Sequence, residues 1–245
     1  RAPSCAPASS TPTRCRRTTS STRSSRPTSR ATGRSRRSSL SATTLGQDRN
    51  VYIAEANSLT NTNITISPAD IHLSAGGDIN TGTGILTGNA ANLVSGGNIN
   101  VQTTVSQLNF TTTANGNVTV NETDNLGQLN IDAGTGDVTI TAGGAITDGD
   151  AALDVTANDI SLTATSVATS VNPLSTSADT LTINSSAANG DQFVTEANGL
   201  TDLNLNAGTG NVALTLTLGS LLDTAADGTD ITATDASITL SDLTA

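Results

Sequence analysis

The residues best suited to chemistry in this chain are aspartates in its second half. Asp148 and Asp150 flank Gly149, and Asp154 and Asp159 follow shortly after them. Ca²⁺ binds several oxygen ligands at once, and a group of closely spaced carboxylates is able to supply them. The segment lacks the closing Glu of an EF-hand loop, and it lacks the Gly-Gly-x-Gly-x-Asp nonapeptide of calcium-binding β-rolls. Two interpretations therefore stay open, solvated turn carboxylates and a calcium site, and no other cofactor is expected.

A second acidic group, Asp223, Asp227 and Asp230, occupies the matching place of a later repeat. The same two interpretations apply to it. Acids that recur in step with a repeat are typical of a scaffold, whereas a catalytic site interrupts the repeat. The recurrence is therefore an argument against catalysis.

The basic residues lead to the same expectation. Glycan-cleaving enzymes on β-helices use paired carboxylates or basic residues in a cleft. All eleven basic residues are Arg at positions 1–49, so residues 50–245 have none, and the one histidine is His72. Because His72 stands between Ile71 and Leu73, strand alternation predicts that it points to the opposite, exposed face. We expect no catalytic residues and no enzyme activity.

These side chains are carried by a repeat that extends from Asn50 onward. Short turns with Asp or Asn precede alternating aliphatic and small polar residues, a pattern that predicts strands with one buried face. Four turn positions that are 20, 19 and 20 residues apart are Asp78, Asn98, Asn117 and Asp137. A repeat of this length is shorter than a βαβ unit or a propeller blade and fits one coil of a solenoid. The sequence predicts an all-β parallel β-helix, or β-solenoid, over residues 48–245.

The Asp and Asn positions form one long column along the repeat. Its members are Asn50, Asp70, Asp78, Asn98, Asn117, Asp137, Asp159, Asp179, Asp191, Asn211 and Asp230. The two short steps, 70 to 78 and 179 to 191, indicate inserted or truncated turns. Stacked Asn side chains are able to bond to one another along the axis, whereas stacked carboxylates repel. The four consecutive aspartates from Asp137 to Asp191 would repel, and a divalent cation would relieve that stretch.

A longer unit is superimposed on the coils. Three similar segments carry Glu55, Glu122 and Glu196, each five residues after a column position and four before a Leu. The glutamates are 67 and 74 residues apart, which indicates about three coils in one long unit. Tyr52 and Phe193 share a position in this unit, two residues after the column. That placement favours core or edge packing over ligand stacking.

Residues 1–47 differ from the repeat in composition. They consist mainly of Ser, Thr, Arg and Pro, and they include Cys5 and Cys15. Because few aliphatic side chains are present to offset the entropy of ordering, we expect a disordered tail. A wrong-frame translation at a damaged gene end is a second interpretation.

Charge divides the chain at the same place. Eleven Arg and Asp48 give residues 1–49 a net charge of +10, and the other 20 acidic residues give residues 50–245 a charge of −20. We expect no nucleic-acid partner, because no aromatic residues accompany the arginines. No apolar run approaches the ~20 residues of a membrane span.

Three segments of the repeat resemble those of giant bacterial surface proteins. The segments are Leu129–Ile140, Gly144–Asp150 and Val171–Leu174, and they are similar to repeats of adhesins of the filamentous haemagglutinin type. The resemblance implies a right-handed β-helix shaft, secretion to the bacterial cell surface, and attachment to host or neighbouring cells, with glycans as candidate ligands. It also implies flanking repeats of the same chain. The alternatives are a pure stalk with no ligand of its own and a glycan-degrading β-helix enzyme.

Overall fold

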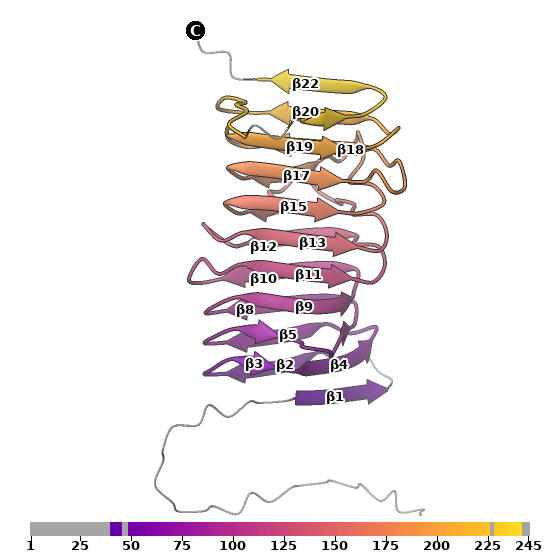
Figure 1. The fold of residues 1–245 in the computed structure, drawn as a ribbon. Helices are drawn as coiled ribbons and strands as arrows, with labels where there is room; N and C mark the ends of the chain where they lie inside the picture. The colour runs from indigo at the N-terminus through magenta and orange to yellow at the C-terminus, as the bar shows by residue number, and fades with distance from the viewer. Residues whose placement is uncertain (1–39, 46–48, 226–227, 242–245) are drawn as a thin grey trace, which may run out of the picture. The chain divides into compact units, whose positions relative to one another are not determined.

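The chain folds into a stack of parallel strands (Figure 1). The structure is a computed structural model that describes residues 40–45, 49–225 and 228–241. The regular elements among these residues are all β-strands joined by turns, which confirms the predicted all-β class. The described part of the chain contains no helix with the length and hydropathy needed to cross a membrane. The predicted tail lies outside the described residues except for its last segment.

The strands form two sheets, and the chain alternates between them. Sheet A has twelve strands: β1 (Leu40–Leu45), β3 (Leu59–Thr60), β4 (Thr62–Ser67), β6 (Ile79–Asn80), β7 (Leu86–Thr87), β9 (Ile99–Thr104), β11 (Val118–Glu122), β13 (Val138–Ala142), β15 (Asp159–Thr163), β17 (Thr180–Asn184), β19 (Asp202–Asn206) and β21 (Ile231–Thr232). Sheet B has ten: β2 (Val51–Glu55), β5 (Ile71–Ala75), β8 (Ala90–Ser95), β10 (Gln107–Thr112), β12 (Gln128–Asp132), β14 (Val155–Thr156), β16 (Leu174–Ser177), β18 (Gln192–Glu196), β20 (Val212–Leu216) and β22 (Ala236–Leu240). Pairing between successive strands of a sheet is parallel. This is the β-solenoid that the repeat predicts.

The solenoid begins earlier than residue 48, so the predicted boundary with the tail is corrected. Strand β1 pairs in parallel with β4, from Leu40 opposite Thr62 to Leu45 opposite Ser67. Ala42 of this strand packs against the core. The strand is hard to recognise in the sequence because its composition is rich in Ser and Thr. Its pairing with β4 of the next coil becomes visible only in the structure.

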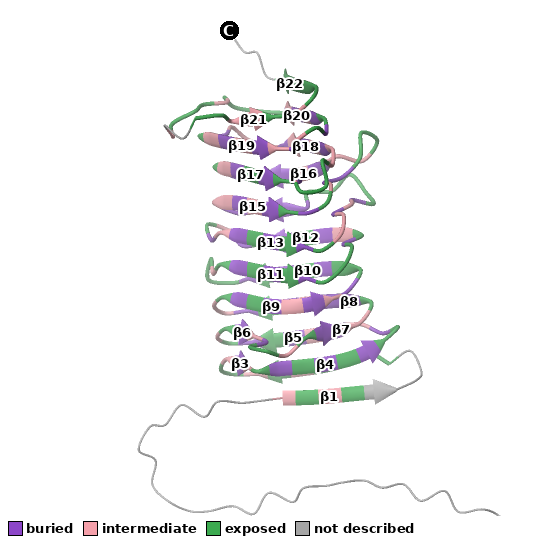
Figure 2. Ribbon diagram, turned by 45° about the vertical axis from the view of Figure 1, so that its right-hand side comes forward, coloured by how far each residue is buried: buried purple, intermediate pink, exposed green. Residues whose placement is uncertain are grey.

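The core is a narrow column of aliphatic side chains between the two sheets. Figure 2 shows buried and exposed residues alternating along the strands. In β11, Val118, Val120 and Glu122 are buried and the two residues between them are exposed. The register places Val120 between Val101 of the preceding coil and Ile140 of the next. Burying such a side chain stabilises the fold by roughly 1.5–3 kcal/mol, so rows of this kind hold the coils together.

The predicted column of Asp and Asn residues is in fact two columns. One precedes strands of sheet A, and the other precedes strands of sheet B. Members that precede strands of sheet A include Asp78, Asn98, Asn117 and Asp137. Members that precede strands of sheet B include Asn50, Asp70, Asp191 and Asn211. The short steps 70 to 78 and 179 to 191 are therefore passages from one sheet to the other. The prediction of inserted or truncated turns at these steps is wrong.

Within each column, the side-chain oxygen of an Asp or Asn in one coil accepts the backbone N–H of the column residue in the next coil. Asn98 N donates to Asp78 Oδ1 at 2.8 Å, and Asn117 N donates to Asn98 Oδ1 at 2.9 Å. Asp137 N continues the series by donating to Asn117 Oδ1 at 3.0 Å. Asn and Asp both carry this acceptor, which explains why the column mixes them. Bonds between side chains of the column, which the sequence predicts, also occur: Asn117 Nδ2 donates to Asp137 Oδ2 at 3.3 Å, and Asn50 Nδ2 donates to Asp70 Oδ2 at 3.4 Å.

The glutamates of the longer unit stand on both sheets. Glu55 in β2 and Glu196 in β18 belong to sheet B, whereas Glu122 in β11 belongs to sheet A. Segments that match in sequence thus lie on opposite sheets, and the predicted unit of whole coils is wrong. Both sides of the solenoid use the same strand-and-turn pattern, so a shift by half a coil leaves that pattern unchanged.

Two equivalent corners require glycine. Gly134 and Gly208 have φ angles of +60° and +63°, which L side chains rarely adopt. In the preceding coil, Asn115 and Asn189 also have positive φ. Asn115 Oδ1 accepts the N–H of Thr135 at 3.3 Å, and a Cβ on Gly134 would collide with that same oxygen. The Ala-Gly-Thr-Gly segments of the repeat are therefore corner sequences.

Candidate functional site

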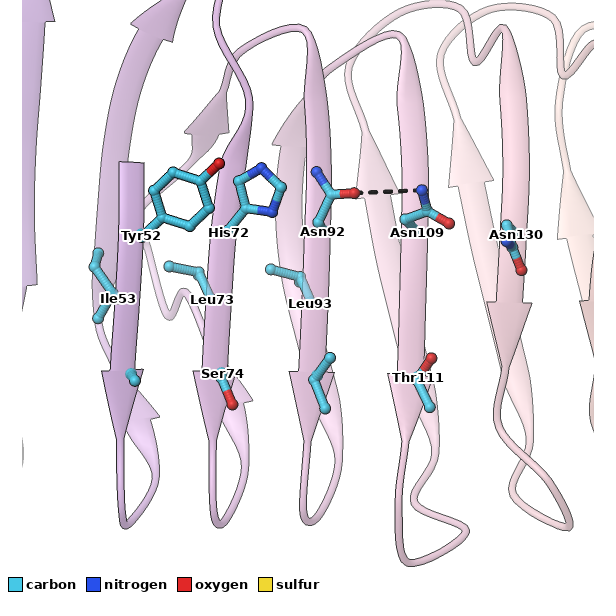
Figure 3. Close-up of a pocket in the computed structure, with 12 residues that line it drawn as sticks. Tyr52, Ile53, His72, Leu73, Ser74, Asn92, Leu93, Asn109, Thr111 and Asn130 are labelled. Atoms are coloured by element: carbon cyan, nitrogen blue, oxygen red, sulfur yellow. Dashed lines mark hydrogen bonds between the residues drawn. The ribbon is translucent and has the colours of Figure 1, made fainter. Parts of the chain in front are cut away.

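A groove lies on the outer face of sheet B in the first coils of the solenoid (Figure 3). The parallel register aligns one outward side chain from each of five successive strands, namely Tyr52, His72, Asn92, Asn109 and Asn130. A second row two residues further along the strands consists of Ala54, Ser74, Val94 and Thr111. The groove that these rows line has a volume of about 520 Å³.

Tyr52 and His72 form the aromatic end of the groove. Their ring centroids are 4.4 Å apart and their planes differ by 10°, so the rings are stacked. Asn50 Nδ2 lies 3.4 Å from the Tyr52 hydroxyl and 3.4 Å from His72 Nε2, so one amide supports both rings. His72 faces away from the buried residues beside it, as predicted, and Tyr52 stacks on it. Tyr52 itself is 72% exposed.

That exposure contradicts the predicted packing of Tyr52 in the core or at its edge. Phe110 is fully buried and Phe193 packs half-buried against the core, but Tyr52 projects outward. In β2, Val51 and Ile53 take the inner face, and alternation directs the residue between them to the outer face. The positions of Tyr52 and Phe193 in the repeat are equivalent, yet their surroundings differ.

The rest of the groove is lined by three amides, by small side chains and by the aliphatic side chains of Ile53, Leu73, Leu93 and Val94. Asn109 Nδ2 donates to Asn92 Oδ1 at 3.3 Å, and Asn92 Nδ2 reaches the carbonyl oxygen of Ile71 at 3.4 Å. The residues that line the groove include no carboxylate and no Lys or Arg. They therefore lack the acid pair that cleaves glycosidic bonds. Flat rings and amides together suit the binding of a neutral ligand rich in hydroxyl groups.

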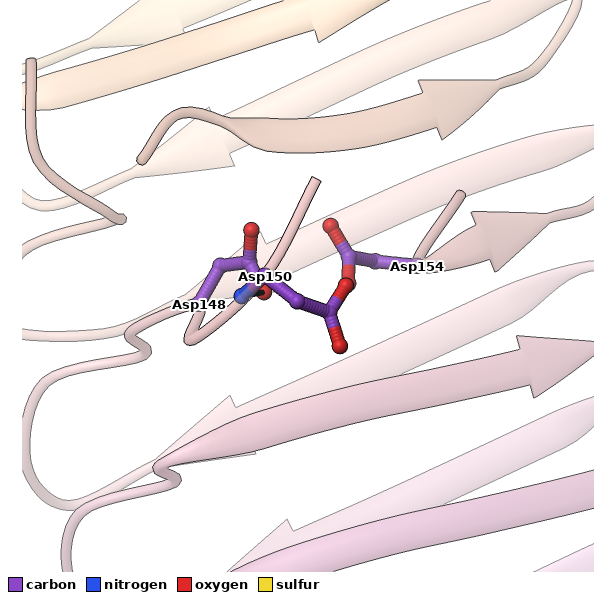
Figure 4. A group of neighbouring side chains, drawn as sticks. All are labelled: Asp148, Asp150 and Asp154. Carbon is purple, nitrogen blue, oxygen red and sulfur yellow. Dashed lines mark hydrogen bonds between the residues drawn. The ribbon is translucent and has the colours of Figure 1, made fainter. Parts of the chain in front are cut away.

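The structure brings together three of the four predicted calcium ligands (Figure 4). One carboxylate oxygen from each of Asp148, Asp150 and Asp154 lies within 4.8 Å of the others. The three residues belong to the loop between β13 and β14. Asp159 is not part of the group, because it opens β15 and accepts a hydrogen bond from the Thr180 hydroxyl at 2.7 Å.

Two members of this cluster are buried, so the interpretation as solvated turn carboxylates holds only for Asp150. Asp154 is 2% exposed and Asp148 is 7% exposed. Burial raises the pKa of Asp154 to about 7. The N–H of Ser175 opposes that shift by donating to Asp154 Oδ2 at 2.7 Å, and the negative charges of Asp148 and Asp150 reinforce it.

The predicted run of four stacked aspartates does not form. Thr180, rather than another carboxylate, lies next to Asp159 in the register. Asn158 Nδ2 approaches Asp137 Oδ1 at 3.5 Å, and Asp191 lies at the entry to sheet B. Polar neighbours therefore separate these carboxylates, and the argument for a cation along the column no longer applies.

The later acidic group is described only in part. Asp223 is exposed and Asp230 is half-buried, while Asp227 lies outside the described residues. The two interpretations of that group stay predictions.

Glu122 is a buried carboxylate at the end of β11, only 1% exposed. Its Oε2 accepts the N–H of Val105, from the preceding coil, at 3.1 Å. Its Oε1 accepts the N–H groups of Thr123 at 2.8 Å and Asp124 at 3.3 Å. Burial raises the pKa of Glu122. Hydrogen bonds from the Thr103 side chain and from the backbone N–H groups of Val105 and Asp124 oppose that shift, whereas the side chain of Asp124 adds to it. Glu122 therefore caps a corner of the scaffold.

Glu196 has the same role on the opposite sheet and is fully buried. Its Oε1 accepts the N–H groups of Ala178 at 3.1 Å and Asn198 at 3.2 Å. Its Oε2 accepts the Thr176 hydroxyl at 2.6 Å. Burial raises the pKa of Glu196 as well, against these hydrogen bonds. Both glutamates are explained by packing, without a ligand.

The two parallel sheets place the described residues in the class of β-solenoids. Comparisons of the chain with models of protein families, with curated protein sequences and with solved structures found no match. The resemblance to filamentous haemagglutinin-type adhesins therefore depends on the repeat segments alone. Any more specific role has to be argued from the groove and the acidic cluster.

Proposed function

We propose that this chain is a structural and adhesive segment of a large secreted bacterial surface protein. Its groove on sheet B binds glycans of a host or neighbouring cell. The observation that carries the proposal is the row from Tyr52 to Asn130, in which two stacked rings are followed by three amides in one line. Repeat packing does not require an outward tyrosine that is 72% exposed, whereas a stacking ligand would.

The solenoid supplies the rod that such a role needs. Each coil is hydrogen-bonded to its neighbours through two sheets, and the core is continuous along the stack. Residues 50–245 carry a charge of −20, which keeps neighbouring rods apart. A stiff, acidic shaft presents its outer faces to large partners and resists collapse onto itself.

The spacing of the groove suits an extended glycan that runs along the solenoid axis. Successive strands are about 4.8 Å apart, close to the length that one sugar ring occupies in an extended chain. A ring could stack on Tyr52 while the following sugars meet the amides of Asn92 and Asn109. Because the lining contains no carboxylate, the expected outcome is binding without turnover.

A glycan array combined with a reducing-sugar assay tests this function. Tyr52→Ala removes the ring and Tyr52→Phe retains it, while Asn121→Ala alters an exposed residue of sheet A as a matched control. An aromatic contact of about 0.5–1.5 kcal/mol predicts that Tyr52→Ala weakens binding roughly twofold to tenfold, with Phe and the control near wild type.

Three results of these assays would speak against the proposal. Release of reducing ends would indicate an enzyme. Absence of any glycan binding would indicate a pure stalk. Binding that Tyr52→Ala leaves intact would place the ligand on another surface.

A further inference from the structure

We propose that Asp148, Asp150 and Asp154 bind one calcium ion in the loop between β13 and β14. The three carboxylates converge from two sides of the loop (Figure 4), with one oxygen of each within 4.8 Å of the others. Asp148 and Asp154 form the buried floor, and Asp150 lies exposed at the mouth. Gln128 Nε2 holds the outer carboxylate by donating to Asp150 Oδ2 at 2.6 Å.

A second observation points to a positive ligand at this place. Asp148 is 7% exposed, and its Oδ2 has no hydrogen-bond partner among the residues that the structure describes. A buried carboxylate oxygen without a donor is costly. Residues 50–245 contain no Lys or Arg, so these coils supply neither side chain to compensate Asp148.

The donor set selects the type of cation. All three ligands are carboxylate oxygens, which suit hard ions such as Ca²⁺ and Mg²⁺ rather than zinc or copper. Calcium binds oxygen at 2.3–2.6 Å, so two of its ligands are separated by up to about 5 Å, whereas magnesium allows only about 4 Å. The three oxygens lie within 4.8 Å of one another, and the longer bonds of calcium accommodate such a separation more readily than those of magnesium.

The loop is also a departure from the repeat. Twelve residues separate β13 from β14, whereas five separate β11 from β12. Nothing lies within 4 Å of a Cβ built on Gly149, so water has room to complete the coordination on the outer side. We expect calcium to hold this longer loop against the coil that contains Ser175, which already donates its N–H to Asp154 Oδ2.

Titration calorimetry with CaCl₂ on chelator-treated full chain, paired with thermal melts, tests the site. The wild type should bind calcium saturably and melt at a higher temperature when calcium is added. Asp148→Asn and Asp150→Asn should each weaken binding by roughly tenfold or more. Asp235→Asn, which removes an exposed carboxylate outside the cluster, is the matched control and should bind as the wild type does.

Several outcomes would overturn the proposal. The wild type could show no saturable calcium binding, or both variants could bind as well as the wild type. Tighter binding of MgCl₂ than of CaCl₂ would contradict the assignment to calcium. Asp150 is exposed, so Asp150→Asn keeps the test decisive if substitution of the buried Asp148 prevents folding.

Discussion

Replacing Glu122 by Gln should destabilise the solenoid, although the side chain keeps its shape. Both carboxylate oxygens of Glu122 accept backbone N–H groups, from Val105 on one side and from Thr123 and Asp124 on the other. An amide has only one acceptor oxygen. In either orientation its NH₂ group faces a backbone donor, and at least one N–H loses its acceptor.

Glu196→Gln is the matched control, because the Oε2 of Glu196 accepts the Thr176 hydroxyl and no backbone N–H, whereas both oxygens of Glu122 accept backbone N–H groups. The amide oxygen can accept the N–H groups of Ala178 and Asn198, as Oε1 does now. The NH₂ group would then lie beside Thr176, whose hydroxyl is able to turn and accept. Both substitutions remove one buried charge, so their difference isolates the donor that is left without a partner.

The expected difference follows from the cost of that donor. A buried N–H without an acceptor costs about 1–3 kcal/mol, and a chain of this size shifts its Tm by about 2–4 °C for each kcal/mol. Thermal melts and urea unfolding at neutral pH should place Glu122→Gln about 1–3 kcal/mol below Glu196→Gln. Equal stabilities of the two variants, or a less stable Glu196→Gln, would refute the assignment of donors and acceptors.

Three further predictions concern pH, the ladders and the corners. Because burial raises the pKa of Glu196 above its ordinary 4.5, stability should rise as the pH falls from neutral towards 4.5 and be lost as the pH rises through the raised pKa. Urea unfolding at about pH 5 and about pH 8 should show a smaller change for Glu196→Gln, and an unchanged profile would contradict the shift. Asp78→Ala should cost about 0.5–1.5 kcal/mol by removing the acceptor of Asn98 N, whereas Asp78→Asn keeps that acceptor, so equal losses in chemical denaturation would argue against the ladder. Gly134→Ala should cost about 1–2 kcal/mol because its φ is +60°; Gly149→Ala is the control with open space around its Cβ, and melts of the two would distinguish them.

The fold could be predicted from the sequence because apolar and polar residues alternate in one strand after another. In β11, Val118 and Val120 are buried and Thr119 is exposed, as the pattern requires. Parallel stacking follows from the repeat length, since a coil that returns after about 20 residues places like residues side by side. The register of Val118 beside Val138 is an example.

The assignment of segments to sheets could not be predicted. Glu122 and Glu196 have similar surroundings in sequence, yet they stand on opposite sheets. Both sheets need an inward polar residue at the end of a strand to cap the following corner. Sequence similarity therefore matches half coils as readily as whole coils, and a unit of three whole coils does not follow from it.

The row of side chains in the groove can be found in the sequence, but a comparison of the average repeat does not show it. Tyr52 and His72 are one coil apart in the register, and both lie between residues that take the inner face. The same step by one coil leads from His72 to Asn92 and then to Asn109, so the row can be traced in the sequence. Averaging over repeats hides such a row, because most other coils carry small polar residues at the outward positions.

The acids of this solenoid can be ordered by the donors that surround them. Glu122 accepts three backbone N–H groups, and Glu196 accepts two together with a hydroxyl. Asp154 accepts the N–H of Ser175, and Asp148 accepts the N–H of Asp150 at Oδ1, but Asp148 Oδ2 has no donor among the described residues. A carboxylate whose neighbours supply enough donors is part of the scaffold and needs nothing from outside. The buried carboxylates in the loop between β13 and β14 differ from these glutamates because they have fewer hydrogen-bond donors. A cation bound in this loop would therefore stabilise their negative charge.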